Sequence, residues 1–358
     1  MITRRGLIQA SALSAIVPVA QAGEAQPPII RLHLNENPYG PSDRAKDAIR
    51  AAINDGWAYD NEDVIVLRRM IAAKEGLKPE NVFICEGSTE LLRLVAAIFT
   101  SGGKELVAGL PTFLAMPQYA ARSGGKVRFV NVDAAMRLDL AAMQAKVTDD
   151  TGAVYVCNPN NPTGTLVAAA ALNAFIVAVE PRALVVVDEA YIDLVDEPEK
   201  TTVIEQVRQG KNLLISRTFS KIHGIAGLRV GYGLGRPDVI RALEERRISV
   251  PNRLGLKAAI ASHQDADFLA FSRMMVRACV AYTEDAFEKM KVKYIPSSGN
   301  FVLFDTRQTS VNFAEYMRGR RILVNPVLEP TDTWCRVSMG RMEQMEAFVE
   351  AARGFFKS

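Results

Sequence analysis

The segment 216-SRTFSKIHGIAGLRVGY-232 combines a single lysine with hydroxyl residues before it and small residues and a lone arginine after it. Lys221 follows Thr218 and Ser220, and Arg229 stands further along. Apolar residues lead into this segment and out of it, so Lys221 is expected at the end of a strand. An amine fixed among hydroxyl and small residues suits a Schiff base to a phosphorylated aldehyde. A surface lysine in a turn is the alternative, and these residues alone leave both open.

The composition is that of an ordinary globular protein. The chain has 358 residues, of which 49% are hydrophobic and 23% charged, enough for two domains and a sizeable core. A net charge of +3 does not point to nucleic acid or to an anionic membrane. The four cysteines form no C-x-x-C pair and are expected to be buried free thiols, and the three histidines lack the spacing of a metal site.

The N-terminus has the features of an export signal. Arg4 and Arg5 form a twin-arginine pattern, residues 6–23 carry no charge, and 20–22 read Ala-Gln-Ala. These features predict a Tat-type signal peptide over residues 1–22 and a periplasmic protein; a short amphipathic or disordered tail on a cytoplasmic protein is the alternative. The run is too short and too rich in Ala and Ser for a stable membrane span, so no membrane association is expected after cleavage.

Apolar strands alternate with helices through the middle of the chain. Strands are expected at 82–85, 105–108, 127–130, 153–157 and 184–187, with two more near Leu213 and Val230. This pattern predicts an α/β fold, a three-layer αβα arrangement around a mostly parallel sheet, with a smaller α+β domain after it. The expected division is an N-terminal arm and part of the small domain over 23–55, a large domain over 56–250 and a small C-terminal domain over 251–358.

Unusual residues follow several of these strands, where ligands bind in parallel sheets. Gly87-Ser88-Thr89 lies between a strand and a helix and predicts a phosphate cradle, with Ser88 as a simple helix cap as the alternative. Residues 158–164 read NPNNPTG, a loop whose two X-Pro pairs fix the asparagine amides, or else an ordinary turn. Asp188 ends a buried apolar strand, where it needs a partner such as a pyridinium N–H, or else caps the next element. Tyr191 can reach the same site.

Two further residues have roles that suit a flat, anionic ligand. Phe113 follows another strand and could stack on a ring, although core packing is the commoner fate of a phenylalanine. Arg336 lies inside a short strand of the second domain, where an inward guanidinium would clamp a carboxylate. A surface ion pair is the alternative for Arg336.

In their order, these motifs resemble the fold-type I pyridoxal-phosphate aminotransferases of class I and II. The matching motifs are GST at 87–89, PTF at 111–113, NPNNPTG at 158–164, VVVDEAY at 185–191, TFSK at 218–221 and CRVSMG at 335–340. The start LNENPYG at 34–40 is similar to the histidinol-phosphate aminotransferase branch in particular. The resemblance covers about residues 29–345.

The resemblance implies that pyridoxal 5'-phosphate is the cofactor and that Lys221 forms the Schiff base with it. Asp188 would then pair with the pyridine nitrogen, Asn161 and Tyr191 would contact the ring oxygen, and Phe113 would stack on the ring. The other cofactor contacts are implied at Gly87, Ser88, Thr89, Thr218, Ser220 and Arg229. Substrate contacts are implied at Arg336, Asn37 and Tyr39. Lys221, Asp188 and Tyr191 are the implied catalytic residues, and no metal is implied.

The implied activity is a ping-pong transamination of the EC 2.6.1 type. It would move an amino group between an L-amino acid, or a histidinol-phosphate-like amine, and a 2-oxo acid. A decarboxylase or lyase on the same scaffold is the alternative, because it would share every cofactor residue. Tyr59 matches a tyrosine that reaches the neighbouring subunit's cofactor in relatives, which implies a homodimer with shared active sites.

The sequence departs from this family at three places. Tyr59-Asp60 stands where relatives have Tyr-Pro, and Phe113 where tyrosine is common. Asn325-Pro326 replaces an Arg-Asp pair whose arginine helps relatives hold the phosphate of histidinol phosphate. Asn325 therefore predicts weak activity with phosphorylated donors.

Overall fold

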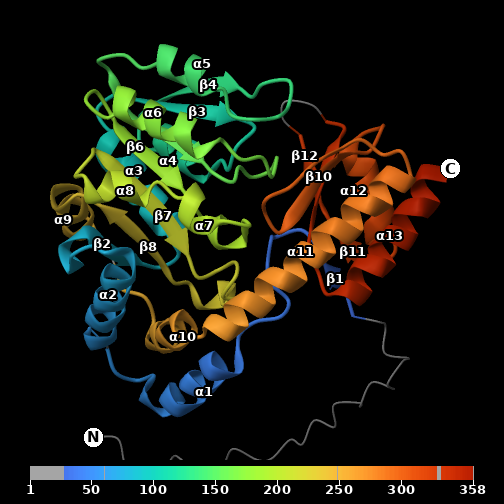
Figure 1. The fold of residues 1–358 in the computed structure, drawn as a ribbon, viewed down its shortest axis with the longest axis horizontal. Helices are drawn as coiled ribbons and strands as arrows, with labels where there is room; N and C mark the ends of the chain where they lie inside the picture. The colour runs from blue at the N-terminus through green and yellow to red at the C-terminus, as the bar shows by residue number, and fades with distance from the viewer. Residues whose placement is uncertain (1–27, 60, 248, 329–331, 358) are drawn as a thin grey trace, which may run out of the picture.

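The computed structural model describes residues 28–59, 61–247, 249–328 and 332–357, which form two bodies connected by the long helix α11 (Ala266–Lys289) (Figure 1). The predicted export signal over 1–22 lies outside the described residues. No helix within the described ranges is long and apolar enough to cross a membrane.

The larger body is built on a seven-stranded sheet in the order β2-β8-β7-β6-β5-β3-β4. Its strands are β2 (Val82–Cys85), β3 (Glu105–Leu110), β4 (Lys126–Asn131), β5 (Thr151–Cys157), β6 (Leu184–Asp188), β7 (Leu213–Thr218) and β8 (Gly231–Gly235). β8 runs antiparallel to β2 and β7, and the other neighbouring pairs are parallel. The predicted mostly parallel sheet is therefore confirmed.

Successive strand residues contribute to cores on opposite faces of this sheet. Val154 and Val156 of β5 pack into one core, and Tyr155 and Cys157 into the other. The first core is covered by α1 (Asp43–Ala52), α2 (Glu62–Glu75), α5 (Leu140–Ala145), α6 (Ala169–Val179), α8 (Ile204–Arg208) and α10 (Arg253–His263). The second is covered by α3 (Ser88–Phe99), α4 (Ala115–Arg122) and α9 (Pro237–Glu245). Both faces are thus shielded, which is why the strands are continuously apolar.

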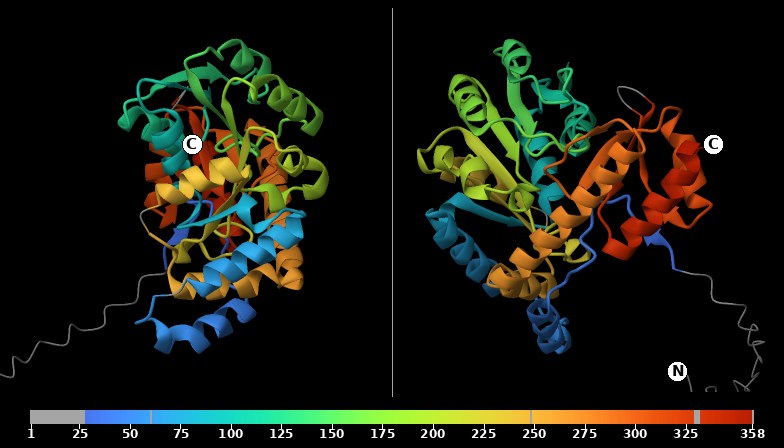
Figure 2. Two further views of the ribbon diagram at one scale, coloured as in Figure 1. Left: turned by 90° about the vertical axis from the view of Figure 1, so that its left-hand side faces the viewer. Right: turned by 45° about the vertical axis from the view of Figure 1, so that its right-hand side comes forward.

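The smaller body, orange and red in Figure 2, contains the C-terminal part of the chain. It holds a four-stranded antiparallel sheet in the order β12-β13-β10-β9. Its strands are β9 (Tyr294–Ile295), β10 (Phe301–Asp305), β12 (Asn325–Val327) and β13 (Trp334–Ser338). β1 (Ile30–Arg31) pairs in parallel with β11 (Ile322–Leu323), which ties the N-terminal arm to this body. α11, α12 (Ser310–Arg318) and α13 (Met342–Lys357) enclose a core rich in phenylalanine.

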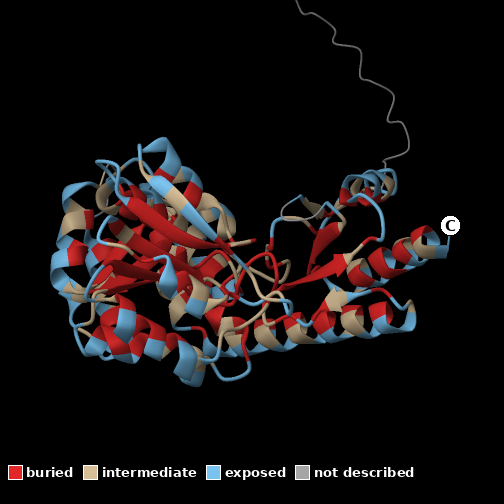
Figure 3. Ribbon diagram, turned by 90° about the horizontal axis from the view of Figure 1, so that it is seen from above, coloured by how far each residue is buried: buried red, intermediate tan, exposed pale blue. Residues whose placement is uncertain are grey.

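The two bodies do not divide the sequence at a single point. α10 shares the core of the large sheet, so the expected boundary at 251 precedes a helix that packs with the larger body. The remaining short segments are η1 (Ile53–Asp55), η2 (Pro79–Asn81), η3 (Ile192–Leu194), α7 (Pro198–Thr201) and η4 (Ala226–Leu228). Figure 3 shows the sheets buried in both bodies and the outer helix surfaces exposed. All four cysteines are buried and free, as expected.

Candidate active site

A cavity of about 1010 Å³ lies where the carboxyl ends of the large-sheet strands face β12 and β13 of the smaller body. The N-terminal arm forms another of its walls. The predicted site residues that line it are Ser88, Thr89, Phe113, Asn161, Asp188, Tyr191, Thr218, Ser220, Lys221, Arg229 and Arg336. Residues that are far apart in the sequence therefore meet at the sheet edge where α/β folds bind ligands.

Lys221 lies just beyond the end of β7, with its amine held by the arm. Its Nζ donates to the carbonyl oxygens of Asn35, at 3.1 Å, and Leu34, at 3.5 Å. Burial, and after it the nearby charge of Arg336, lower the pKa of Lys221 to about 8, while Asp188 opposes the shift. The amine is therefore partly neutral, and so nucleophilic, close to neutral pH.

Asp188, the last residue of β6, is buried and only half satisfied. Its Oδ2 accepts a hydrogen bond from the Tyr155 hydroxyl at 2.9 Å, while Oδ1 has no partner among the described residues. Burial raises the pKa of Asp188 to about 6. A buried carboxylate oxygen without a donor is costly, so this position suits a ligand that brings an N–H, above all a cationic one.

The opposite part of the cavity has the features of an anion site. α3 begins at Ser88 with Gly87 as its N-cap, so the alternative that Ser88 is the cap is wrong. Gly87 has φ 74°, and a Cβ there would lie 2.9 Å from Cζ of Arg229, so glycine allows the guanidinium to approach the helix start. Thr218 donates to Ser220 Oγ at 2.9 Å beside them. A helix N-terminus, an arginine and hydroxyls together suit a phosphate group.

Arg336 crosses from the smaller body into the cavity from β13. Its Nη1 donates to Asn161 Oδ1 and its Nη2 to the His33 carbonyl oxygen at 2.8 Å. Within the described part of the chain both partners are neutral oxygens, and the buried Nε has no partner. Asn325 lies opposite Arg336 on β12 and also lines the cavity. The surface ion pair considered for Arg336 is therefore wrong, and its charge is available to a ligand.

Four predicted residues lie outside the lining of this cavity. Gly87 lies behind Arg229. Asn37 donates to the Ile222 carbonyl at 2.8 Å and to Ser272 Oγ at 2.5 Å, and Tyr39 packs edge-on against Phe271. Tyr59 is 99% exposed and contributes nothing to the cavity of its own chain.

Sequence reasoning did not single out Tyr155, and it associated the arm around Asn35 to Tyr39 with substrate choice without giving Asn35 a contact of its own. Tyr155 reads as one more apolar residue of its strand, although it is on the same face as Cys157, which pairs with Asp188 across β5 and β6. The available signal was the alternation of side chains along a strand, which places residues 155 and 157 on the same face. Asn35 stood in the arm, but its contacts depend on the folded path of that arm.

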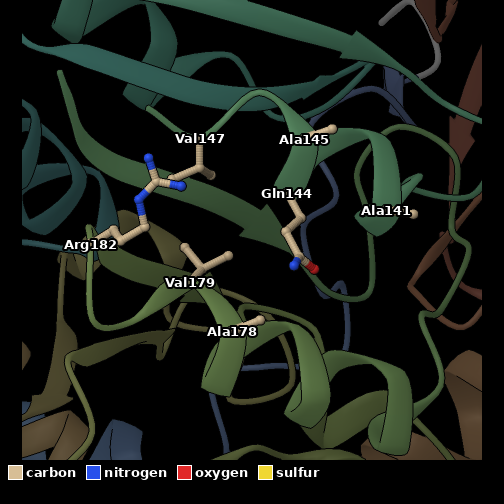
Figure 4. A pocket seen from close by; sticks show the side chains of 7 residues that line it. All are labelled: Ala141, Gln144, Ala145, Val147, Ala178, Val179 and Arg182. Atoms are coloured by element: carbon tan, nitrogen blue, oxygen red, sulfur yellow. The ribbon is translucent and has the colours of Figure 1, made fainter. Parts of the chain in front are cut away.

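A second hollow, of about 390 Å³, lies between α5 and α6 on the outside of the larger body (Figure 4). Its lining is mostly aliphatic, and its one charged residue, Arg182, pairs with Asp149 at 3.0 Å. No group of three or more metal-ligating side chains occurs within the residues that the structure describes. The reactive side chains are concentrated in the larger cavity.

Comparison with known proteins gives a consistent result. The family described as aminotransferase class I and II matches residues 27–351. A histidinol-phosphate aminotransferase of Moorella thermoacetica is 39% identical over 330 residues, covering 91% of this chain and 85% of that protein. Histidinol-phosphate aminotransferase 2 of Pseudomonas aeruginosa is 36% identical over 327 residues, covering 90% of this chain and 88% of its own.

Solved structures show the same fold. The histidinol-phosphate aminotransferase of Sinorhizobium meliloti in complex with pyridoxal 5'-phosphate has a TM-score of 0.84 and 27% identity, covering 97% of this chain and 99% of that one. An aspartate aminotransferase of Thermotoga maritima has a TM-score of 0.83 at 21% identity, covering 92% of each chain, which is a likeness of fold.

Proposed function

Because this chain belongs to the class I and II aminotransferase family, which uses pyridoxal 5'-phosphate, we propose that its large cavity transfers an amino group from an L-amino acid to a 2-oxo acid by a ping-pong mechanism. The observation that carries this proposal is the meeting of the Lys221 amine, the unpartnered Asp188 oxygen and the Arg229 anion site in one cavity. These are the three partners that an aldehyde, a pyridinium N–H and a phosphate require.

The residues present fit that cofactor. Asp188 Oδ1, which no described residue satisfies, would accept the pyridine N–H. Arg229, with the start of α3 and the hydroxyls of Thr218 and Ser220, would hold the phosphate. Phe113, Asn161 and Tyr191 line the space between these two ends.

The cofactor, when bound, supplies an electron sink for the electrons of the substrate Cα–H bond. Lys221, with its pKa lowered to about 8, can take the Cα proton and return it. Asp188 supplies the negative charge that keeps a pyridine nitrogen protonated. Arg336 holds the substrate carboxylate, since its guanidinium has neutral partners and an unused Nε.

The charges around the cavity bear on the substrate. Among the described residues that line it, the cations are Lys221, Arg229 and Arg336. With Lys221 and Arg229 engaged by the cofactor, Arg336 is left for one substrate anion. Asn325 is neutral, and Leu34, Leu114, Val327 and Leu328 contribute apolar lining. Glu36 also lines the cavity, but its carboxylate pairs with Arg31. A donor with one carboxylate and an apolar or aromatic side chain fits better than histidinol phosphate, the substrate in the names of the relatives from Moorella thermoacetica, Pseudomonas aeruginosa and Sinorhizobium meliloti.

The test is a half-reaction. The cofactor-loaded protein is mixed with single amino donors, including aromatic amino acids and histidinol phosphate, and the visible absorption of the bound cofactor is followed together with product analysis. Loss of the band with formation of a 2-oxo acid is expected for aromatic donors. Release of CO₂ without a 2-oxo acid would assign the protein to the decarboxylase alternative, and an unchanged band with every donor would contradict the proposal.

A homodimer is part of the same proposal. Tyr59 is 99% and Trp57 is 87% exposed, and Ile53, Ile65 and Val66 beside them in sequence are also exposed. Large apolar side chains exposed together suit an interface. We expect a second copy to cover them, with Tyr59 reaching its partner's cofactor. Sedimentation or light scattering should give twice the chain mass, and Trp57→Asp should reduce it to the chain mass.

Export remains a proposal from the sequence alone. The twin arginines and the Ala-Gln-Ala site support periplasmic residence after transport in the folded state. Folding first would allow the cofactor to bind in the cytoplasm. Cell fractionation should find a protein beginning at Gly23 in the periplasm, and Arg4→Lys with Arg5→Lys should retain it in the cytoplasm.

A further inference from the structure

We infer that Asn35 is a positioning residue for the reaction, one that holds the Tyr191 hydroxyl with its proton directed into the cavity. This inference rests on the proposed function. Asn35 lies in the arm between β1 and α1, is 1% exposed and lines the cavity. No role for it follows from the motifs, and its importance comes from the direction of its hydrogen bonds.

The hydrogen bonds around Asn35 have a defined polarity. The Asn35 backbone N–H donates to Ser338 Oγ at 2.9 Å. The Ser338 hydroxyl donates in turn to Asn35 Oδ1 at 2.8 Å. The amide oxygen therefore faces Ser338, and Nδ2 donates to the Tyr191 hydroxyl oxygen at 2.9 Å. Because Tyr191 accepts from Asn35, its own proton is available to an acceptor in the cavity.

Tyr191 is suited to act as that donor. Burial raises the pKa of Tyr191 well above its ordinary value, so the phenol remains protonated at neutral pH. Its ring packs edge-on against Phe301 with centroids 5.2 Å apart, and the Lys221 Nζ lies 5.4 Å from its ring centroid. The ring position is thus set by packing, and the direction of the O–H by Asn35.

The backbone of Asn35 serves the same site. Its φ of 54° is in the left-handed region, which asparagine tolerates better than most residues. Its carbonyl oxygen accepts from Lys221 Nζ at 3.1 Å and from Asn300 Nδ2 at 3.0 Å. Ser338 and Arg336 belong to the same strand, β13. One arm residue thus links the Lys221 amine, the Tyr191 hydroxyl and the strand that carries Arg336.

The consequence concerns the acidic ring oxygen of the cofactor. A hydroxyl that donates to this ring oxygen would stabilise the oxygen as an anion. The oxygen would then hold less tightly the proton that it shares with the Schiff-base nitrogen. Without Asn35 the Tyr191 proton would no longer be directed toward the ring oxygen. The midpoint of the band titration, which is the pH at which the cofactor's absorption band is half converted, should therefore rise. The reaction should slow while substrate affinity, which depends on Arg336, changes little.

Asn35→Gly tests this inference, because glycine keeps the φ and the carbonyl and removes only the side chain. The midpoint of the band titration should rise by about one pH unit, and kcat should fall about 5- to 20-fold with KM nearly unchanged. Tyr191→Phe should raise the midpoint in the same way. In the Tyr191→Phe background, Asn35→Gly should cause no further shift.

Two comparison variants separate positioning from simple loosening of the arm. Asn37→Ala removes another buried arm amide, one bonded to Ile222 and Ser272, and should lower Tm while leaving the midpoint in place. Ser338→Ala keeps Asn35 but removes the hydroxyl that orients its amide, and should raise the midpoint by a smaller amount. This variant also tests the inference should Asn35→Gly not fold.

Four results would overturn the inference. A lowered midpoint in Asn35→Gly would mean that the amide lies the other way and withdraws the Tyr191 proton. An unchanged midpoint, or an equal rise with and without Tyr191, would mean that Asn35 does not act through that hydroxyl. If the wild-type protein consumes amino donors and Asn35→Gly matches it in band midpoint and kcat, only this inference fails. If the wild-type protein consumes no donor, the proposed function fails.

Discussion

Arg336 Nη1 donates to Asn161 Oδ1 across the boundary between the two bodies. Arg336 comes from the smaller sheet, and Asn161 from the loop after β5 of the larger one. The side chain proposed to hold the substrate is thus positioned by a residue proposed to contact the cofactor. Binding of substrate and the relative placement of the two bodies are therefore expected to be coupled.

Arg336→Ala is expected to raise KM for amino donors by about 100-fold, because a buried charge-assisted pair contributes a few kcal/mol. Cofactor affinity, measured by titration of the absorption band, should be nearly unchanged. Arg336→Lys keeps the charge without the fork and should recover only part of the affinity. Unchanged donor affinity in both variants would show that Arg336 does not hold the carboxylate.

Lys221→Ala is expected to abolish turnover and the absorption band characteristic of the cofactor joined to a lysine. The cofactor should still bind through its phosphate and ring contacts, so dialysis should release it only slowly. Lys221→Arg is the matched variant, since it keeps a cation but cannot form the Schiff base. A variant without Lys221 that retained the band would show that another amine carries the cofactor.

Asp188→Asn is expected to have opposite effects on the stability of the folded protein with and without cofactor. In the cofactor-free protein, the raised pKa of about 6 means that folded Asp188 holds a proton more tightly than in the unfolded chain. Stability from this group is therefore lost as pH rises from about 4 to 6, by up to about 3 kcal/mol. The amide that replaces the carboxyl does not titrate, so the cofactor-free variant should be the more stable protein at pH 7.

With cofactor bound, the wild-type protein should be more stable than Asp188→Asn at pH 7. The variant would lack the anion that pairs with the pyridine N–H, so its cofactor affinity should fall at least about 10-fold and its activity further. Thermal unfolding of both proteins at pH 4 and pH 7, each with and without cofactor, measures all four cases. Equal stabilities of the two cofactor-free proteins at pH 7 would contradict the burial of Asp188 with one oxygen left without a donor among the described residues.

The sequence predicted the sheet and most of the cavity because each motif follows a local rule. The strand Val82–Cys85 was expected with its observed bounds, because it is an apolar run that ends shortly before Gly87. A strand was expected near Val230, but the antiparallel direction of the observed strand Gly231–Gly235 was not, because strand direction depends on the path of distant connections. The same limit applies to Asn35, whose partners lie 156 and 303 positions away.

Gly87→Ala tests the close approach of Arg229 to the start of α3. A Cβ at Gly87 would lie 2.9 Å from Arg229 Cζ, so the guanidinium must move away from the anion site, and φ 74° is also strained for alanine. Gly102→Ala is the matched control, because Gly102 has φ 68° and nothing within 4 Å of its added Cβ.

Both variants should lose about 1–2 kcal/mol of stability from backbone strain. Only Gly87→Ala should also weaken binding of cofactor, by about 10-fold or more, in a titration that compares the phosphorylated with the unphosphorylated aldehyde. Equal cofactor affinity in the two variants would show that Arg229 does not hold the phosphate, because strain is the only effect they share.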